Sequence, residues 1–307
     1  MSDHPDGRPE VNGTATLLLR GAVECHVHSF PDVVDRKVDD LDLVEQARAA
    51  GLRALVLKSH VCSTCERAYL LNRLQPDVRV LGGVVLNDTV GGLNPRAVEA
   101  ALEMGARQVW MPTKSAANHQ QHYGVRGGLS IFADAGLSAA PGGSRVNGST
   151  LQPEVLDIVR LVADADAVLA TGHLAPEESR VLIEEALAAG VRRVSVTHPE
   201  WGVTAMPIDV QQDLARHGYV YFERCLVSIE RDLHGHVPFE TIVRQIQMVG
   251  VETTIVATDY GMPQYPAPVD GLRDYLARLL AAGFDEAAIR RMAQDNPARL
   301  LGLEPAP

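Results

Sequence analysis

The sequence Glu24-Cys25-His26-Val27-His28-Ser29 follows the apolar residues Gly21-Ala22-Val23, and together they predict a short buried strand. Side chains alternate between the two faces of a strand, so His26 and His28 point the same way while Val27 points into a hydrophobic layer. Two imidazoles on one face at the end of a strand can share a metal ion. They can equally form a hydrogen-bonded pair that lines a cleft, and these six residues alone favour neither.

The composition of the 307-residue chain favours a soluble enzyme and argues against nucleic acid or an anionic membrane as a partner. Asp and Glu outnumber Lys and Arg by 39 to 28, which gives a formal net charge of -11, and polyanions repel such a chain. The sequence has no apolar run long enough for a membrane span. With 46% hydrophobic residues the chain can bury a large core. We expect a small-molecule substrate, and a homo-oligomer is compatible with the sequence, which does not fix the number of subunits.

The N-terminal residues differ in composition from the rest of the chain. Met1–Gly13 is polar, contains Pro and Gly, and lacks the apolar segment of a secretory signal. We therefore expect a disordered leader over residues 1–18, a single domain over residues 19–307, and a cytoplasmic protein.

Beyond the leader, short apolar segments alternate with segments of helical periodicity. The predicted strands end near residues 28, 58, 86, 111, 171, 197, 222 and 258. Each unit takes about 33 residues, close to the spacing of barrels in which about 250 residues form eight units. Continuous apolar strands followed by helices imply a parallel sheet covered on both faces. We predict a single-domain (β/α)8 TIM barrel rather than a doubly wound open sheet, because polar residues end many strands instead of gathering at one crevice.

The alternation is interrupted after the fourth predicted strand. Residues 113–150 are rich in Gly, Ser, Ala and Asn, and include Gly127-Gly128 and Pro141-Gly142-Gly143. A long irregular segment inside a compact domain is usually functional or mobile. We therefore expect a long loop excursion that passes over the site.

Chemically active side chains stand at the ends of most predicted strands. In strand order they are His26 and His28, Lys58 and His60, Lys114, His173, His198, Glu223 and Asp259. In a parallel barrel the carboxyl ends of all strands meet at one face, where the active site lies. Histidines on strands one, five and six, together with an aspartate on strand eight, therefore predict one shared site.

The ordered set His26-Val27-His28, His173, His198 and Asp259 resembles the amidohydrolase superfamily of metal-dependent hydrolases, with its phosphotriesterase- and dihydroorotase-like barrels. The segment Asn296–Leu303 also looks like the C-terminal segment of that superfamily, and the resemblance covers roughly residues 20–303. It implies one or two divalent metal ions per chain. His26, His28 and Asp259 would bind the first, His173 and His198 the second, and Asp259 would be ligand and general base in turn. Zinc suits imidazole and carboxylate ligands, and manganese, iron or nickel are the alternatives.

Two-metal members of the superfamily need an anionic bridge, often a lysine carboxylated on its amine, and two lysines here could supply it. Lys58 ends the second strand at the depth of His26, whereas Lys114 comes from the fourth strand, the expected place, but follows Pro112-Thr113 into the loop. We favour Lys58 as the metal ligand slightly over Lys114. The remaining alternative is a single-metal site in which these lysines bind an anionic substrate, and we predict Lys114 as a substrate-binding residue.

Two further polar residues have no place in the superfamily's ligand set. His60 could bind substrate or stabilise a developing oxyanion, and we predict a catalytic role for it; a hydrogen-bonded structural role is about as well supported. Glu223 is predicted as a substrate-binding residue, with two alternatives: it could orient a ligand histidine or form a buried ion pair.

These residues together predict a metal-dependent hydrolase in which a metal-activated water attacks a small molecule. Asp259 would take the proton from the water and pass it to the leaving group. We expect the scissile bond to be a C–N bond of an amide or cyclic amide or imide, or a lactone ester bond. The alternatives are a single-metal decarboxylase of the same superfamily and a metal-binding barrel without catalysis.

Overall fold

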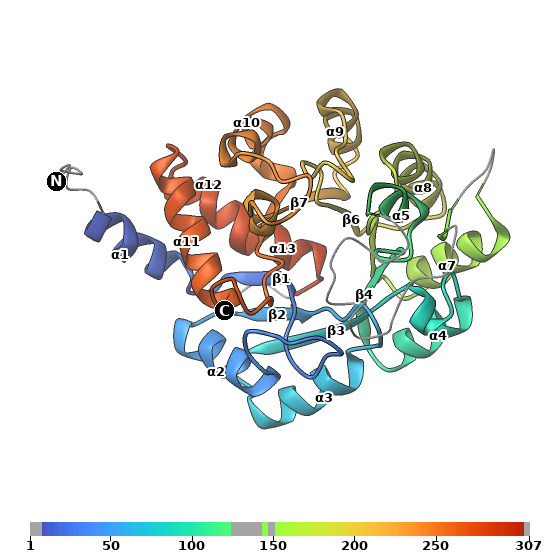
Figure 1. The fold of residues 1–307 in the computed structure, drawn as a ribbon, viewed down its shortest axis with the longest axis horizontal. Helices are drawn as coiled ribbons and strands as arrows, with labels where there is room; N and C mark the ends of the chain where they lie inside the picture. The colour runs from blue at the N-terminus through green and yellow to red at the C-terminus, as the bar shows by residue number, and fades with distance from the viewer. Residues whose placement is uncertain (1–7, 124–142, 147–150, 304–307) are drawn as a thin grey trace.

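A parallel sheet of eight strands forms the centre of the molecule, as the computed structural model of the chain shows for residues 8–123, 143–146 and 151–303 (Figure 1). The strands are β1 (Val23–Val27), β2 (Ala54–Leu57), β3 (Arg79–Val85), β4 (Ala106–Trp110), β5 (Val168–Ala170), β6 (Val194–Thr197), β7 (Val220–Cys225) and β8 (Thr254–Ala257). Each strand pairs in parallel with the next one along the chain. This topology confirms the predicted (β/α)8 barrel.

Backbone hydrogen bonds between β1 and the end of β8 bring the first and last strands together. The amide of Asp259 donates to the carbonyl of His26 at 2.9 Å, and the amide of His28 donates to the carbonyl of Tyr260 at 2.9 Å. The buried carboxylate of Glu24 adds to this junction, because it accepts hydrogen bonds from the amides of His26 and Thr258. The barrel is therefore joined at the same residues that the sequence predicts to hold a metal.

Helices cover the outside of the sheet, with α2, α3 and α4 on one side of the view in Figure 1 and α8, α9 and α10 on the other. The helices of the repeat are α2 (Asp40–Ala50), α3 (Cys65–Leu74), α4 (Pro95–Glu103), α7 (Pro153–Asp164), α8 (Pro176–Ala188), α9 (Ile208–Ala215), α10 (Phe239–Val249) and α11 (Pro268–Ala281). Local signals set their ends: the Asp39 side chain accepts from the amide of Asp42 at the start of α2, and Gly51 ends that helix in the left-handed conformation. After α11 the chain continues through α12 (Glu286–Arg290), a π-helical turn (Arg291–Asp295) and α13 (Asn296–Leu300).

The N-terminal segment differs from the disordered leader that the sequence predicts. Arg8–Leu18 forms helix α1, which packs against α11. Ala15, Leu18 and Leu19 are fully buried, and burial of such apolar side chains stabilises an ordered helix. Residues 1–7 of the expected leader lie outside the described residues.

The excursion after β4 begins with a short helix. α5 (Ala117–Tyr123) follows the end of β4 and places His119 among buried residues. Residues 124–142 and 147–150 lie outside the described residues, so the greater part of the predicted excursion over 113–150 stays a prediction.

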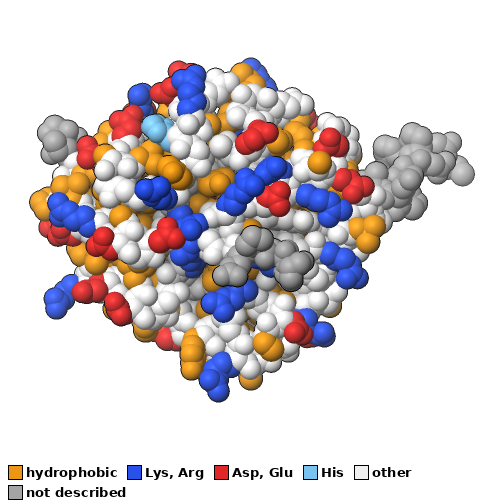
Figure 2. All heavy atoms as spheres, turned by 180° about the vertical axis from the view of Figure 1, so that it is seen from behind, with side chains coloured by type: hydrophobic (Ala, Val, Ile, Leu, Met, Phe, Trp, Pro, Cys, Tyr) orange, Lys and Arg blue, Asp and Glu red, His pale blue; other side chains and the backbone are white. Residues whose placement is uncertain are grey.

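The surface shows no simple charge pattern on the face drawn in Figure 2, where acidic, basic and hydrophobic side chains are interspersed. In the part of the chain that the structure describes, no helix is both long enough and apolar enough to cross a membrane. Cytoplasmic localisation and a homo-oligomer stay predictions.

Candidate metal centre

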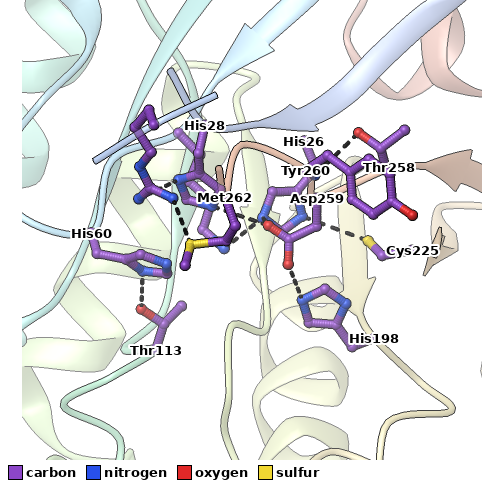
Figure 3. Close-up of polar contacts among 12 residues, drawn as sticks. His26, His28, His60, Thr113, His198, Cys225, Thr258, Asp259, Tyr260 and Met262 are labelled. Atoms are coloured by element: carbon purple, nitrogen blue, oxygen red, sulfur yellow. Dashed lines mark hydrogen bonds and ion pairs between the residues drawn. The ribbon is translucent and has the colours of Figure 1, made fainter. Parts of the chain in front are cut away.

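Three imidazoles converge on one carboxylate at the carboxyl ends of the strands (Figure 3). The Oδ1 atom of Asp259, which follows β8, lies 2.9 Å from Nε2 of His26 and 3.0 Å from Nε2 of His28. Its Oδ2 atom lies 3.1 Å from Nε2 of His198, which follows β6. The structure thus brings together four of the residues that the sequence predicts as ligands.

An unusual backbone conformation places two of these four side chains. His198 and Asp259 both have φ of 52°, in the left-handed region that few residues other than glycine adopt. Hydrogen bonds hold them there, because the amide of His198 donates to the carbonyl of Glu223 and that of Asp259 to the carbonyl of His26. Residues held in such conformations are typical of functional sites.

The charges of the centre favour an ionised Asp259. Burial raises the pKa of this carboxyl, but the neighbouring His26 and the hydrogen bonds from three imidazoles outweigh burial and hold the pKa well below its usual range. Burial disfavours protonation of His26, yet Asp259 and Glu223 together raise its pKa. Burial lowers the pKa of His28 and His198, which keeps both imidazoles neutral, and neutral imidazole is the metal-binding form.

Glu223 lies behind His26 rather than in the cavity. Its Oε1 atom is 2.6 Å from Nδ1 of His26, and both side chains are fully buried. Oε2 lies 3.4 Å from the hydroxyl of Ser195. This arrangement orients the His26 ring, so the geometry gives no contact that would make Glu223 a substrate-binding residue and favours the orienting role.

Lys58 is buried at the end of β2, directly beside the centre. Its Nζ lies 2.8 Å from Nε2 of His26 and 5.5 Å from the centre of the Trp110 ring. Gly83 leaves room for that ring, since a Cβ there would lie 2.6 Å from an atom of Trp110. Burial lowers the pKa of Lys58, although Asp259 and Glu223 oppose the shift.

His173 is held on the cavity wall by a residue of the excursion. Its Nδ1 lies 2.9 Å from Nδ1 of His119 in α5, and the two rings stack with centres 4.8 Å apart. Gly172 makes this placement possible: it has φ of 60°, and a Cβ there would lie 2.3 Å from the carbonyl oxygen of Met111. The His173 ring centre is 5.8 Å from that of His198.

The His60 ring stacks on the His28 ring, and the two ring centres are 4.8 Å apart. Its Nδ1 lies 2.9 Å from the hydroxyl oxygen of Thr113, which also accepts a hydrogen bond from the side-chain amide of Asn87. Because that oxygen already accepts from Asn87, its own proton can go to Nδ1 of His60. This pairing favours the tautomer with a proton on Nε2, which suits a hydrogen-bond donor.

A cavity opens over the centre. Its polar lining comprises His28, Arg36, His60, Lys114, His173, His198, Asp259 and Gln264. Its apolar lining comprises Trp201, Val227, Leu233, Met262 and Tyr265. The predicted substrate-binding residue Lys114 therefore lines the cavity, and burial lowers the pKa of its ammonium to about 7.

Residues 21–223, from the start of β1 to the middle of β7, match the model of a family described as a family of unknown function, DUF6282. The chain belongs to DUF6282. The matched range contains the three histidines that converge on Asp259, together with Lys58, His173 and Glu223, and ends before Asp259. No curated protein matches the chain in sequence.

Solved structures resemble this DUF6282 chain over nearly its whole length. An amidohydrolase from Pseudomonas aeruginosa shares 13% identity, covers 94% of this chain and 98% of its own, and has a TM-score of 0.63. A mutant of a PTE-like lactonase from Deinococcus radiodurans shares 14% identity, with 94% and 97% covered and a TM-score of 0.57. A 2,6-dihydroxybenzoate decarboxylase shares 14% identity, with 92% and 100% covered and a TM-score of 0.52. At these identities the likeness shows a shared (β/α)8 barrel fold.

The residues of the DUF6282 chain fit a divalent metal ion. Two groups of donor atoms lie close enough to hold one among the described residues, His26–His28–Asp259 and His26–His198–Cys225. Nδ1 of the buried His198 has no hydrogen-bond partner in the described part of the chain, although buried polar atoms are normally paired. Imidazole and carboxylate donors suit zinc and its neighbours. His173 belongs to neither group.

The sequence does not predict two residues of the site in this DUF6282 chain. Arg36 lies in the loop after β1 and His119 in the excursion. Neither ends a strand, so their position in the barrel could not be derived from the repeat. A weak signal was available for Arg36, because Asp32 stands four residues earlier and pairs with it at 2.7 Å.

Proposed function

We propose that this chain is a metal-dependent hydrolase that cleaves a C–N bond of an amide or cyclic amide or imide, or the ester bond of a lactone, in a small molecule. The observation that carries the proposal is the convergence of Nε2 of His26, His28 and His198 on the Asp259 carboxylate, within 3.1 Å, at the floor of a cavity. The fold shared with an amidohydrolase and a lactonase supports this class of reaction.

In this proposal His26, His28 and Asp259 hold the first divalent cation, and His198 with His173 a second; zinc is the ion that this donor set favours. A bound cation lowers the pKa of water and polarises the substrate carbonyl. The proton transfers are assigned to a residue of the chain itself. Asp259, ionised because its pKa is held low, takes the proton of the attacking water at a carboxylate oxygen and later gives it to the leaving group.

His60 is the candidate for stabilising charge on the substrate oxygen. It lines the cavity, and its pairing with Thr113 favours a proton on Nε2. A neutral donor of this kind can stabilise an oxyanion as charge develops. Glu223, buried behind His26, fixes the plane of the His26 ring.

We propose Lys58 rather than Lys114 as the lysine that is carboxylated. Its Nζ is 2.8 Å from Nε2 of His26, which is the reason for preferring it. Burial lowers the pKa of both lysines, which favours the neutral amine in each. The neutral amine adds to carbon dioxide, forms an N-carboxylate and releases one proton. The product is an anion, which relieves the repulsion that an ammonium would feel beside metal cations.

The test is the metal content of the native protein, with carbon-13 NMR of protein prepared in labelled bicarbonate to detect a lysine carboxylate. We expect two metal ions per chain, a carboxylated Lys58, and metal-dependent turnover in a panel of amides and lactones that Asp259→Asn abolishes. A protein that takes up no metal when metal is supplied contradicts the proposal.

One observation favours a second candidate, a single-metal decarboxylase. His173 belongs to neither of the two close donor groups and pairs with His119 instead. One metal ion per chain, with unmodified Lys58 and Lys114, would favour this reaction. In that case aromatic and aliphatic acids are tested as substrates in place of the amides, and the release of carbon dioxide is measured.

A further inference from the structure

A buried guanidinium, that of Arg36, lines the cavity together with Lys114. The Arg36 side chain is only 3% exposed. Buried cations are costly unless they are paired, and the carboxylate of Asp32 pairs with Arg36 at 2.7 Å.

Asp32 holds the guanidinium of Arg36 in a fixed orientation, and among the described residues Nη1 contacts only a weak acceptor. Nε and Nη2 both donate to Oδ2 of Asp32, at 2.9 and 2.7 Å. Nη2 also lies 3.4 Å from Nδ1 of His28. Nη1 contacts the thioether sulfur of Met262 at 3.6 Å, and a thioether is a weak acceptor.

The other walls of the cavity are apolar and partly aromatic. Trp201 and Tyr265 contribute rings, and Val227, Leu233 and Met262 contribute aliphatic and thioether surface. Sites of this composition bind the apolar body of a ligand and fix its orientation with a few polar groups. The Arg36 guanidinium contacts the sulfur of Met262.

We propose that the cavity binds a substrate that carries a carboxylate on a flat apolar body, with Nη1 of Arg36 holding the carboxylate beside Met262. Arginine suits this role because a guanidinium N–H forms a charge-assisted hydrogen bond with a carboxylate. The inference rests on the proposed function in one respect only, namely that the ligand of this cavity is the substrate. Arg36 is a binding residue in this account and takes no part in bond cleavage.

The experiment compares benzoate with benzamide, which has nearly the same shape and no charge. Ligand-observed NMR titrations are made on the protein as isolated, with its metal content measured, and on the protein after chelation. We expect benzoate to bind about tenfold or more tightly than benzamide in both forms, since a charge-assisted hydrogen bond contributes a factor of this size. Arg36→Met should weaken benzoate by about tenfold and leave benzamide nearly unchanged.

Two further variants complete the design. Lys37→Met removes a cation from the same loop, at an exposed side chain outside the cavity lining, and should leave both ligands unchanged. Arg36→Lys keeps the charge beside Asp32 and should lose less benzoate affinity than Arg36→Met. The wild-type comparison needs no variant, so the test survives if Arg36→Met fails to fold.

The outcomes separate this inference from the proposed function. Equal binding of benzoate and benzamide, or a benzoate preference that Arg36→Met leaves intact, overturns the carboxylate site while metal-dependent hydrolysis can still be observed. A benzoate preference that depends on Arg36 in a protein that takes up no metal supports the carboxylate site and contradicts the metal-dependent hydrolase.

Discussion

Nδ1 of His26 lies 2.6 Å from Oε1 of Glu223, while Nε2 of the same ring lies 2.9 Å from Oδ1 of Asp259. One imidazole thus joins a buried carboxylate on β7 to the carboxylate at the end of β8. Burial raises the pKa of Glu223, but His26 outweighs burial and lowers it, so Glu223 remains an anion. An anionic acceptor at Nδ1 fixes the tautomer that presents a lone pair at Nε2 to a metal ion.

We predict that Glu223→Gln weakens metal binding about 10- to 100-fold, because the amide is a poorer acceptor and can present N–H to the ring. Metal affinity is measured by competition with a chromophoric chelator. Glu185→Gln, at an exposed position on α8, is the control and should retain wild-type affinity. Unchanged affinity in Glu223→Gln would mean that the His26–Glu223 contact is structural only.

Asp259→Asn should lower turnover by at least about 100-fold, the lower range for loss of a positioned acid–base group. Asparagine tolerates the left-handed backbone, so the fold should survive. Asp166→Asn provides a matched control, since Asp166 also has positive φ but is exposed and pairs with Arg193. Far-ultraviolet circular dichroism checks the fold of both variants, and activity at the level of Asp166→Asn would remove Asp259 from the proposed reaction.

His119→Ala should weaken metal binding about tenfold, because it removes the partner that holds His173. The control is His122→Ala, one turn along α5, where the side chain is exposed and bonds to the carbonyl of Asn118. Metal content after dialysis against graded chelator gives the result. If only one metal ion binds and His119→Ala leaves it in place, His173 is not a ligand.

The metal-free protein should lose stability as the pH falls below about 6.5, the usual value for histidine. Burial lowers the pKa of four histidines, His28, His60, His173 and His198. The unfolded chain therefore takes up protons in this range that the folded chain cannot, and the free energy of unfolding falls by about 1.4 kcal/mol per pH unit for each such proton. His26 acts in the opposite sense, because its raised pKa contributes stability that is present below 6.5 and is lost as pH rises through its folded value. Glu24 also opposes the effect, because burial raises its pKa to about 8 and the folded chain holds this proton over the range in which the unfolded chain has lost it.

Urea unfolding at a series of pH values between 5 and 7 measures this slope. His60→Asn removes one of the four histidines and should make the slope shallower, whereas His217→Asn, at an exposed position, should not change it. A free energy of unfolding that stays constant over this range contradicts the prediction.

Gly172→Ala should destabilise the protein by more than the strain of the left-handed backbone alone, which is about 1–2 kcal/mol. A Cβ at Gly172 would meet the carbonyl oxygen of Met111 at 2.3 Å. Gly190→Ala isolates the strain term, since Gly190 also has positive φ but a Cβ there meets no atom within 4 Å. Equal loss of stability in the two variants, measured by denaturant unfolding, would show that the contact with Met111 relaxes.

The sequence predicts the barrel well because each strand is a short buried apolar run, and the helices between them carry clear start and stop signals. The end of β7 was harder to predict. Glu223 and Arg224 look like the polar end of a strand, yet the strand continues to Cys225 because both side chains are buried with partners. Glu223 pairs with His26, and Arg224 pairs with Glu200. Such partners are distant in sequence and invisible in a local pattern.

The position of each residue relative to the strand ends explains which site residues the sequence predicts. His26, His28, His198 and Asp259 stand at strand ends, and the parallel barrel collects strand ends at one face whatever the loops do. Arg36 reaches the cavity through a loop whose path depends on Asp32 and Met262, and no periodicity fixes such a path. The roles of the found residues stay predictions until metal binding is measured.

The hydrogen bonds that join β1 to the end of β8 run through His26, His28 and Asp259 themselves. The proposed ligands of the first metal ion therefore come from residues that are more than 230 positions apart in the chain. During synthesis, a nascent chain shorter than about 260 residues contains His26 and His28 but lacks Asp259. Because a domain generally folds as a unit, this group of residues would form only after β8 has been made. Metal binding at this group would then follow the synthesis of β8, and a chain truncated before β8 would be released without the metal ion.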